Sequence, residues 1–401
     1  MRVLLTSSRN TFALDMVRKL AAAGHTVVAS DTYGGAIGSH SKYVAAHVVT
    51  ASPTFDTDQF IADVSEAVTT YNLDTIIPTF EEAFYLAARR SDLPDGVQVF
   101  TGSFADLARL HDKDSFQRIA KEAGAPVPPT ILATDDASLR AAADSFDHYF
   151  ARAAFSRGGV DLLTNTGPLA SHTTIDKVHP TAEQPWLVQP FVDGPMVCSY
   201  STVINSRVTA HSTYRAPEQW EASTGIEFLA VDSTQSLAHA QKIAAQLDNF
   251  TGQLSFDYVD HDGELTMIEC NPRTTNGVIL MDTQQLSDGI TKPGSGPSVV
   301  PPGQEVALDA AVVLEAFHER LSHLPVSVHD LVSAKNLGAG WHDPRAMLWA
   351  PASIVHGLEL SAGHHERALA ALGEDIVWDG QPIPGMSEAD AAALKGIRAE
   401  Q

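Results

Sequence analysis

The first hundred residues alternate short apolar runs with longer segments whose apolar residues recur at helical spacing. The runs at residues 3–5, 26–29 and 74–78 predict buried strands. The intervening segments 11–23 and 58–71 predict amphipathic helices. Alternation of this kind is typical of a parallel sheet with helices on its faces. We therefore expect a Rossmann-like domain over residues 1–110.

The pattern changes after residue 110. A predicted helix begins at Asp112 and ends near Gly124, before a connection that contains three prolines. Short apolar runs then predict strands at residues 148–153, 186–192, 197–204 and 208–214, and a helix is predicted at 236–249. This mixture indicates an α+β region.

The last hundred residues give a weaker pattern. Residues 292–303 are rich in Pro, Gly and Ser and predict a linker or surface loop. The segment 306–321 follows with a helical apolar spacing. We expect this helix to pack against the preceding domains, because its apolar side needs a partner.

Composition narrows the class of protein. The chain has 401 residues, of which 44% are hydrophobic and 19% charged, as in ordinary globular proteins of two or three domains. Its net charge of −23 argues against a nucleic-acid surface. Two cysteines do not make a disulfide framework or a zinc cluster. Neither a signal peptide nor a membrane-spanning run is visible, so a cytoplasmic enzyme without a membrane partner is expected.

The sequence argues against a dinucleotide site at the first sheet. Asp31 ends the second predicted strand, where such a fold would hold a ribose. The first turn, residues 6–10, is Thr-Ser-Ser-Arg-Asn and lacks the glycines that a pyrophosphate requires. A dehydrogenase is therefore disfavoured.

The segment Met-Ile-Glu-Cys-Asn-Pro-Arg at residues 267–273 carries the most chemistry. Alternate residues of a strand share a face, so Glu269, Asn271 and Arg273 would point together. A carboxylate, an amide oxygen and a guanidinium on one face can hold a hard cation and the phosphates that accompany it. The preceding predicted strand, residues 255–259, adds Asp257.

The turn between these two strands determines whether the carboxylates meet. A two-residue Asp-Gly loop would place Asp257 and Glu269 on opposite faces, and an odd loop would place them on the same face. We expect an odd, three-residue loop with Gly263 in the left-handed conformation, because paired carboxylates suit magnesium. An exposed hairpin with scattered charges is the alternative.

Two further segments have both a chemical and a plain structural interpretation. Residues 151–160 follow a strand with Ser156, Arg157, Gly158 and Gly159, which could close over phosphates or form an ordinary turn. Residues 186–194 could offer backbone groups to an adenine or be a buried strand and a turn. Neither segment decides the question alone.

The order of these segments resembles the ATP-grasp superfamily, in particular its carbamoyl-phosphate-synthetase-like and carboxylate–amine ligase branches. The resemblance covers roughly residues 1–285. It implies an ATP-grasp fold over residues 111–290, with a small subdomain at 111–190, a metal-site subdomain at 191–290 and ATP between them. Residues 291–401 would form a C-terminal extension. ATP and Mg²⁺ are the implied cofactors, with Mn²⁺ as a second candidate metal.

The resemblance also implies roles for individual residues. Lys113 and Arg152 would be the two cationic nucleotide ligands, and Ser156, Gly158 and Gly159 would cover the β- and γ-phosphates. Backbone groups of Gln189, Pro190, Phe191 and Val192 would hold adenine. Asp193 would replace the acid that many relatives place after the hinge glycine for ribose, where this chain has Pro195, Met196, Val197 and Cys198. Asp257, Glu269 and Asn271 would hold magnesium, and Arg273 would meet the phosphoryl group.

The implied reaction is the ATP-dependent joining of a small carboxylate to an amine through an acyl phosphate, by a homodimer. Arg157, Arg215 and Arg273 are candidates to hold the substrate carboxylate or the acyl phosphate. Glu81 and Glu82 follow a predicted strand, where they could meet an amine, although acids are also favoured at the start of a helix. The alternatives are a carbamoyl-phosphate-type kinase acting on bicarbonate or carbamate, and an ATP-binding regulator without turnover.

Overall fold

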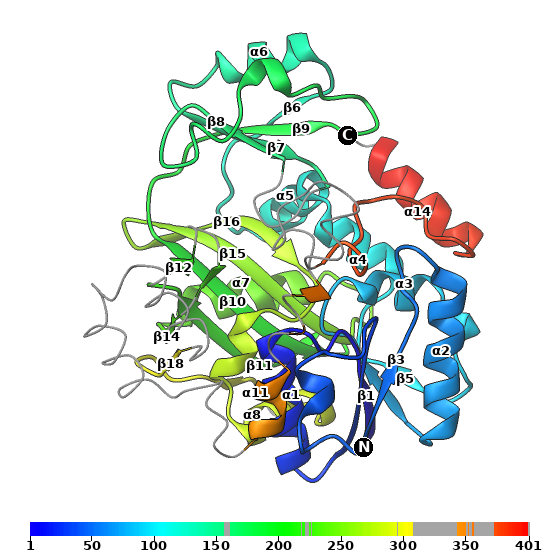
Figure 1. Ribbon diagram of the computed structural model, residues 1–401. Helices are drawn as coiled ribbons and strands as arrows, with labels where there is room; N and C mark the ends of the chain where they lie inside the picture. Colours follow the sequence, from blue (N-terminus) through cyan, green and yellow to red (C-terminus); the bar gives the residue numbers. More distant parts are fainter. Residues whose placement is uncertain are drawn as a thin grey trace.

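The computed structural model describes residues 1–155, 161–217, 219–220, 224–225, 227–294, 296–307, 343–349, 352, 355–356 and 373–399. Three larger sheets organise this part of the chain (Figure 1). One sheet lies in the N-terminal region, a second lies at the centre of the molecule, and the third belongs to a smaller lobe at the top of the view.

The N-terminal sheet is parallel, in the order β3-β2-β1-β4-β5. Its strands are β1 (Arg2–Leu5), β2 (Thr26–Asp31), β3 (Ala46–Val49), β4 (Thr75–Ile77) and β5 (Gln98–Val99). Val3 and Leu5 pack on one side with helix α1 (Thr11–Ala22), while Leu4 packs on the other with α2 (Thr57–Thr70). Alternate apolar residues thus bury both faces, which confirms the Rossmann-like prediction.

Two helices lead from this sheet to the centre of the molecule. α4 (Phe104–His111) is followed at once by α5 (Lys113–Glu122), and the Asp112 side chain between them caps α5 by accepting from Ser115 N. α5 packs against the strand β16 of the central sheet. The remaining short helices of this region are α3 (Glu82–Ala88), η1 (Gly38–His40) and η2 (Arg90–Asp92).

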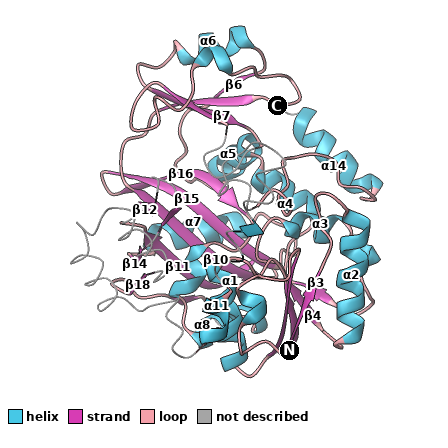
Figure 2. Cartoon of the chain, viewed as in Figure 1, coloured by secondary structure: helices cyan, strands magenta, loops and turns pink. Residues whose placement is uncertain are grey.

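The smaller lobe is a four-stranded sheet in the order β6-β9-β7-β8. Its strands are β6 (Ile131–Ala133), β7 (Tyr149–Ala153), β8 (Leu162–Thr164) and β9 (Trp186–Pro190), joined in part by α6 (Asp136–Ala143) and η3 (Ile175–Lys177). Leu139, Ala151, Leu163, Trp186 and Val188 build its separate core. Figure 2 shows this lobe standing above the edge of the central sheet that carries β16.

The central sheet has the order β16-β15-β10-β11-β14-β18, and β17 pairs with β11. Its strands are β10 (Met196–Ile204), β11 (Arg207–Arg215), β14 (Glu227–Ala230), β15 (Gly252–His261), β16 (Glu264–Asn271), β17 (Ser298–Val299) and β18 (Glu305–Ala307). Phe256 and Tyr258 share one core with α4, α5 and α7 (Thr234–Ala244). Tyr200 and Ala210 share another with α1, η4 (Asn276–Leu280) and α8 (Thr283–Thr291). A short pair, β12 (Gln219–Trp220) and β13 (Thr224–Gly225), lies apart from it.

The C-terminal part corrects two predictions. The segment 292–303 is not a simple linker, because β17 within it pairs with β11. The helix predicted at 306–321 is wrong at its start, since Val306 lies in β18 and pairs with Phe228 of β14; the rest of that segment lies outside the described residues. Pairing with an available sheet edge overrides the helical spacing of the local sequence.

Residues 373–399 return to the N-terminal region. Trp378 is fully buried and stacks on Phe84 at 4.5 Å between ring centroids, and helix α14 (Glu388–Ala399) packs along α4 (Figure 1). A further short helix, α11 (Pro344–Leu348), packs against η1. The expectation that the C-terminal region packs against the catalytic body is therefore confirmed for these residues. Among the described helices, none combines the length and apolar character needed to cross a membrane.

Candidate functional site

The turn between β15 and β16 contains only Asp262 and Gly263, because His261 pairs directly with Glu264. Both turn residues have positive φ, 51° and 87°, as tight two-residue hairpins require. The predicted three-residue loop is therefore wrong. By itself, this even loop would put Asp257 and Glu269 on opposite faces of the sheet.

A β-bulge restores the shared face. Tyr258 pairs with Met267, whereas Asp257 pairs with Glu269, so Ile268 is an extra residue in β16. The bulge also frees the carbonyl of Ile268 for other partners. That oxygen accepts from Arg152 Nη2 at 2.5 Å and from Gln117 Nε2 at 3.0 Å. The bulge thus aligns the two carboxylates and binds β16 to β7 and α5.

Asp257, Glu269 and Asn271 form one cluster. Asn271 Nδ2 donates to Asp257 Oδ2 at 3.2 Å and to Glu269 Oε1 at 3.3 Å. Burial and the adjacent charge of Glu269 raise the pKa of Asp257 to about 7. Although burial opposes it, the charges of Lys113 and Arg152 lower the pKa of Glu269 to about 2. The two carboxylates therefore resist being ionised together, and a divalent cation would relieve this crowding of negative charge.

The donor set fits a hard cation. Two carboxylates and an amide, which offers Oδ1 after a rotation about χ2, are typical oxygen ligands of Mg²⁺. Within the described part of the chain, groups of three or more His, Cys, Asp or Glu residues able to hold a metal do not occur.

Two buried cations face the carboxylates from different elements. Arg152 of β7 donates from Nη1 to Glu269 Oε2 at 2.9 Å. Lys113 begins α5, and its backbone N–H donates to Ala154 O at 3.0 Å. Burial lowers the pKa of Lys113 to about 8, with Arg152 contributing and Glu269 opposing. The structure thus brings Lys113 and Arg152 to the same cluster, and their role as the two nucleotide ligands stays a prediction.

Arg273 lies on the other flank of the cluster. Its guanidinium is 4.3 Å from the centre of the Phe80 ring, and its Nη2 is 3.3 Å from Glu81 Oε1. Its charge lowers the pKa of Asp257, although burial dominates that pKa. Phe80 and Glu81 follow β4, at the carboxyl end of the parallel N-terminal sheet. Ligands of open α/β sheets bind at this edge.

Glu82, the neighbour of Glu81, has a structural role. Its Oε1 accepts from Thr6 Oγ1 at 2.5 Å and from Thr79 N at 2.9 Å, and its side chain is fully buried. Burial raises the pKa of Glu82. The simpler of the two sequence interpretations, an acid at the start of a helix, applies to it.

The predicted adenine hinge is the end of β9. Gln189 is buried and donates from Nε2 to Thr130 Oγ1 at 2.8 Å, and Phe191 N donates to His148 O at 2.9 Å. Pro190 and Val192 are half-buried and Asp193 is exposed. Gly194 follows this segment. Only glycine fits at this position, because a Cβ there would lie 2.2 Å from Asp260 O. These residues therefore belong to the smaller lobe, and their contact with adenine remains a prediction.

Arg215 does not join the cluster. It forms an ion pair with Asp260. Asp260 is three residues beyond Asp257 on β15 and thus faces the opposite side of the sheet. This position corrects the expectation that Arg215 holds a substrate carboxylate beside the cluster. Ser156, Arg157, Gly158 and Gly159 lie outside the described residues.

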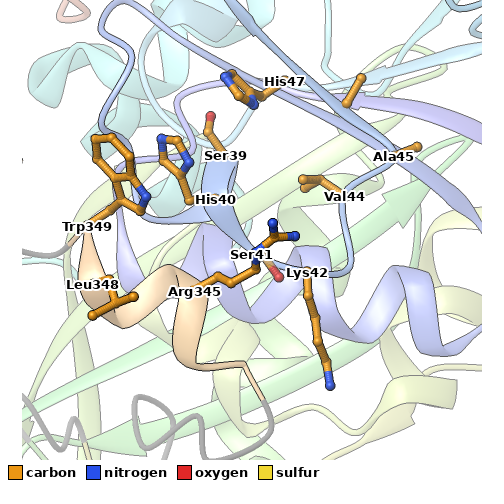
Figure 3. Close-up of a pocket in the computed structure, with 11 residues that line it drawn as sticks. Ser39, His40, Ser41, Lys42, Val44, Ala45, His47, Arg345, Leu348 and Trp349 are labelled. Carbon is orange, nitrogen blue, oxygen red and sulfur yellow. The ribbon is translucent and has the colours of Figure 1, made fainter.

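A cavity of about 480 Å³ lies elsewhere, beside η1 (Figure 3). His40 stacks on Trp349 there with ring centroids 3.9 Å apart, and Lys42, His47 and Arg345 also line it. None of these residues belongs to the carboxylate cluster.

Three further contributors to the cluster gave no signal of this role in the sequence. Cys198 of β10 lies directly across from Asp257, Gln117 of α5 binds the bulge, and Phe80 covers Arg273. Only tertiary structure brings these residues to the site, and none lies in a recognisable motif.

No protein-family model matches this sequence. Solved structures are similar to it. N5-carboxyaminoimidazole synthetase from Staphylococcus aureus, complexed with ADP, gives a TM-score of 0.56 at 13% identity, over 80% of this chain and 86% of that chain. Phosphoribosylamine–glycine ligase from Thermotoga maritima gives 0.54 at 14% identity, over 76% and 78%.

A third similar structure is the biotin carboxylase domain of 2-oxoglutarate carboxylase from Hydrogenobacter thermophilus, in complex with Mg-ADP, ADP and bicarbonate. Its TM-score is 0.51 at 14% identity, over 69% of this chain and 64% of that chain. These likenesses establish the fold. The chain has a Rossmann-like parallel sheet followed by the ATP-grasp fold, as the sequence predicted.

Proposed function

We propose that this protein is an ATP-dependent ligase that joins a small carboxylate to an amine and releases ADP and phosphate. The observation that carries the proposal is the cluster of Asp257, Glu269 and Asn271, faced by the buried cations Lys113 and Arg152. Opposed oxygen ligands and cations suit a metal-bound triphosphate. The similarity to structures holding ADP and Mg-ADP supports it.

The chain's own residues would supply positioning and charge. Lys113 and Arg152 would bind phosphate oxygens from the side of the smaller lobe, and Arg273 would bind the group in transfer from the side of the N-terminal sheet. Magnesium, held by Asp257, Glu269 and Asn271, would neutralise charge on the β- and γ-phosphates. Ser156, Gly158 and Gly159 would cover those phosphates, while residues 189–192 would hold adenine and Asp193 the ribose.

The proposed reaction has two balanced steps. A carboxylate oxygen of the substrate attacks the γ-phosphorus, and ADP leaves as the P–O bond to it breaks. The amine nitrogen then attacks the acyl carbon, inorganic phosphate leaves, and the nitrogen loses a proton. Because water would hydrolyse the acyl phosphate, both steps need a closed site between the smaller lobe and the central sheet.

Bicarbonate is a second candidate acceptor. One structural neighbour was crystallised with bicarbonate, and bicarbonate presents the same carboxylate group to an Arg or Lys side chain. Phosphorylation of bicarbonate would use the same cations and metal ligands. The acceptor array therefore has to include it.

The test is a turnover assay with Mg-ATP and an array of carboxylates, bicarbonate among them, each paired with amines. ADP and phosphate should form only with a productive pair and only with a divalent cation. Asp262→Asn, an exposed carboxylate at the turn of the same hairpin, serves as the matched control and should keep full activity. AMP and pyrophosphate, or turnover that survives chelation, would exclude this mechanism. Nucleotide binding without any turnover would instead favour the alternative of an ATP-binding regulatory protein.

A further inference from the structure

Arg273 is held loosely compared with Arg152. Arg273 Nη2 is 3.3 Å from Glu81 Oε1, and its Nη1 is 3.4 Å from Thr274 O. Arg273 Nε is buried without a hydrogen-bond partner in the described structure, as is Arg152 Nε, so the two residues differ in the contacts of their terminal nitrogens. The corresponding distances for Arg152 are 2.9 Å and 2.5 Å. The guanidinium of Arg273 therefore keeps donors available although its ring-facing side is fixed over Phe80.

Glu81, in contrast, is firmly held. Its side chain is fully buried, and its Oε2 accepts from Trp378 N at 3.0 Å. Its Oε1 makes no hydrogen bond among the described residues and lies 3.3 Å from Arg273 Nη2, while the charge of Glu81 also acts on Lys113. The positive charge of Arg273 stabilises the buried carboxylate of Glu81, so the two side chains constrain each other.

We propose that Glu81 is a positioning residue for Arg273. The carboxylate fixes the plane of the guanidinium beside Asp257 and leaves Nε and Nη1 to donate to the phosphoryl group in transfer. Residues 373–378 take part indirectly, because the backbone of Trp378 fixes the orientation of Glu81. This inference rests on the proposed function and extends it to a residue of the N-terminal region.

The geometry also disfavours the other use of Glu81, as a ligand of a substrate amine. Both carboxylate oxygens are turned to protein groups, and the side chain has no exposed surface. An amine could reach it only after the displacement of Arg273 or of the Trp378 segment.

Glu81→Gln tests the proposal, because glutamine can still accept from Trp378 N while it removes the charge. Since a charge-assisted contact is replaced by a neutral one, kcat should fall roughly tenfold or more, with the KM for Mg-ATP unchanged within about twofold. In an Arg273→Met background, the same substitution should have no further effect on kcat. Glu82→Gln is the matched control: it should lower the Tm without reducing the kcat of the folded enzyme.

Three results would overturn the proposal: a kcat for Glu81→Gln within twofold of wild type, a further loss of kcat in the Arg273→Met background, or a loss that only follows the folded fraction. Calorimetry distinguishes failure of the role proposed for Glu81 from failure of the proposed ligase function. Wild type should bind Mg-ADP, and vanadate, a mimic of the transferring group, should increase the affinity more for wild type than for Glu81→Gln. If wild type binds no Mg-ADP, the proposed function fails. If both proteins gain equally from vanadate, only the role of Glu81 fails.

Discussion

Asp257 lies directly opposite Glu269 across β15 and β16, although an even, two-residue turn joins these strands. The single extra residue Ile268 corrects the register between the turn and the carboxylates. The bulge thereby links hairpin geometry to chemistry, because the same distortion that aligns the acids exposes the Ile268 carbonyl to Arg152. Bulges near active sites re-aim side chains in this way.

The pairing makes the metal-free protein sensitive to pH at Asp257. The folded-state pKa, about 7, lies above the ordinary value of 3.8. The folded state therefore holds more protons than the unfolded state between these values, and stability falls as the pH rises through about 7. Asp257→Asn removes this ionisation. Without metal at pH 8, the Tm of this variant should exceed that of wild type by at least about 2 °C.

Differential scanning fluorimetry from pH 5 to pH 8 measures this difference. The gap should narrow towards pH 5 and should reverse in saturating Mg²⁺ with nucleotide, which only the wild type binds well. Asp262→Asn provides the control, with no comparable pH dependence. A wild-type Tm above that of Asp257→Asn at pH 8 without metal would contradict the assigned carboxylate pair.

Much of this architecture could be predicted from local sequence. The buried strands β1, β2 and β4 appear as apolar runs, and Glu269 and Asn271 alternate on a strand with Cys270 behind them. The edge strand β3 was not predicted, because His47 interrupts its apolar residues and two of its four side chains are exposed. The bulge at Ile268 has no sequence signal, since either loop parity fits the same residues.

Long-range contacts limited the prediction further. Glu81 is 297 residues from Trp378 in the sequence, and neither residue type indicates that the two would meet. Likewise, Val306 fits a helical pattern, but the free edge of β14 determines its strand conformation. The local sequence pattern does not indicate which sheet edge a later segment will pair with.

Glu269→Ala should abolish turnover and destabilise the protein. Removal of this carboxylate leaves Arg152 and Lys113 buried without their main counter-charge, which costs on the order of 3–5 kcal/mol in comparable buried pairs. Glu269→Gln should retain more stability, because the amide can still accept from Arg152, but should lose kcat by about 100-fold or more. Urea unfolding and single-turnover ADP release measure the two effects separately. Near-normal activity in Glu269→Gln would show that the metal assignment is wrong.

The ionisation of Lys113 should limit the affinity for nucleotide at alkaline pH. Because burial lowers its pKa to about 8, the free protein loses this positive charge as the pH rises through that value. The affinity for Mg-ADP should therefore decline above pH 8. Lys113→Arg keeps its charge at all these pH values and should bind with a flatter profile, whatever its absolute affinity. Calorimetric titrations at pH 7, 8 and 9 measure the slope, and equal slopes in both proteins would exclude Lys113 as a phosphate ligand.

Trp378→Ala tests whether the C-terminal segment belongs to the folded body. Trp378 is fully buried, stacks on Phe84 and contacts Phe104 edge-on at 5.4 Å, so truncation should cost about 3–5 kcal/mol. It also removes the support of the segment that binds Glu81, so kcat should fall even under conditions that keep the variant folded. Trp349→Ala is the matched control, because that side chain is 43% exposed and lines a cavity that shares no residue with the carboxylate cluster. If Trp378→Ala unfolds at the same urea concentration as Trp349→Ala, the segment is an appendage. If it unfolds earlier and also loses kcat while folded, residues 373–399 complete both the core and the active site.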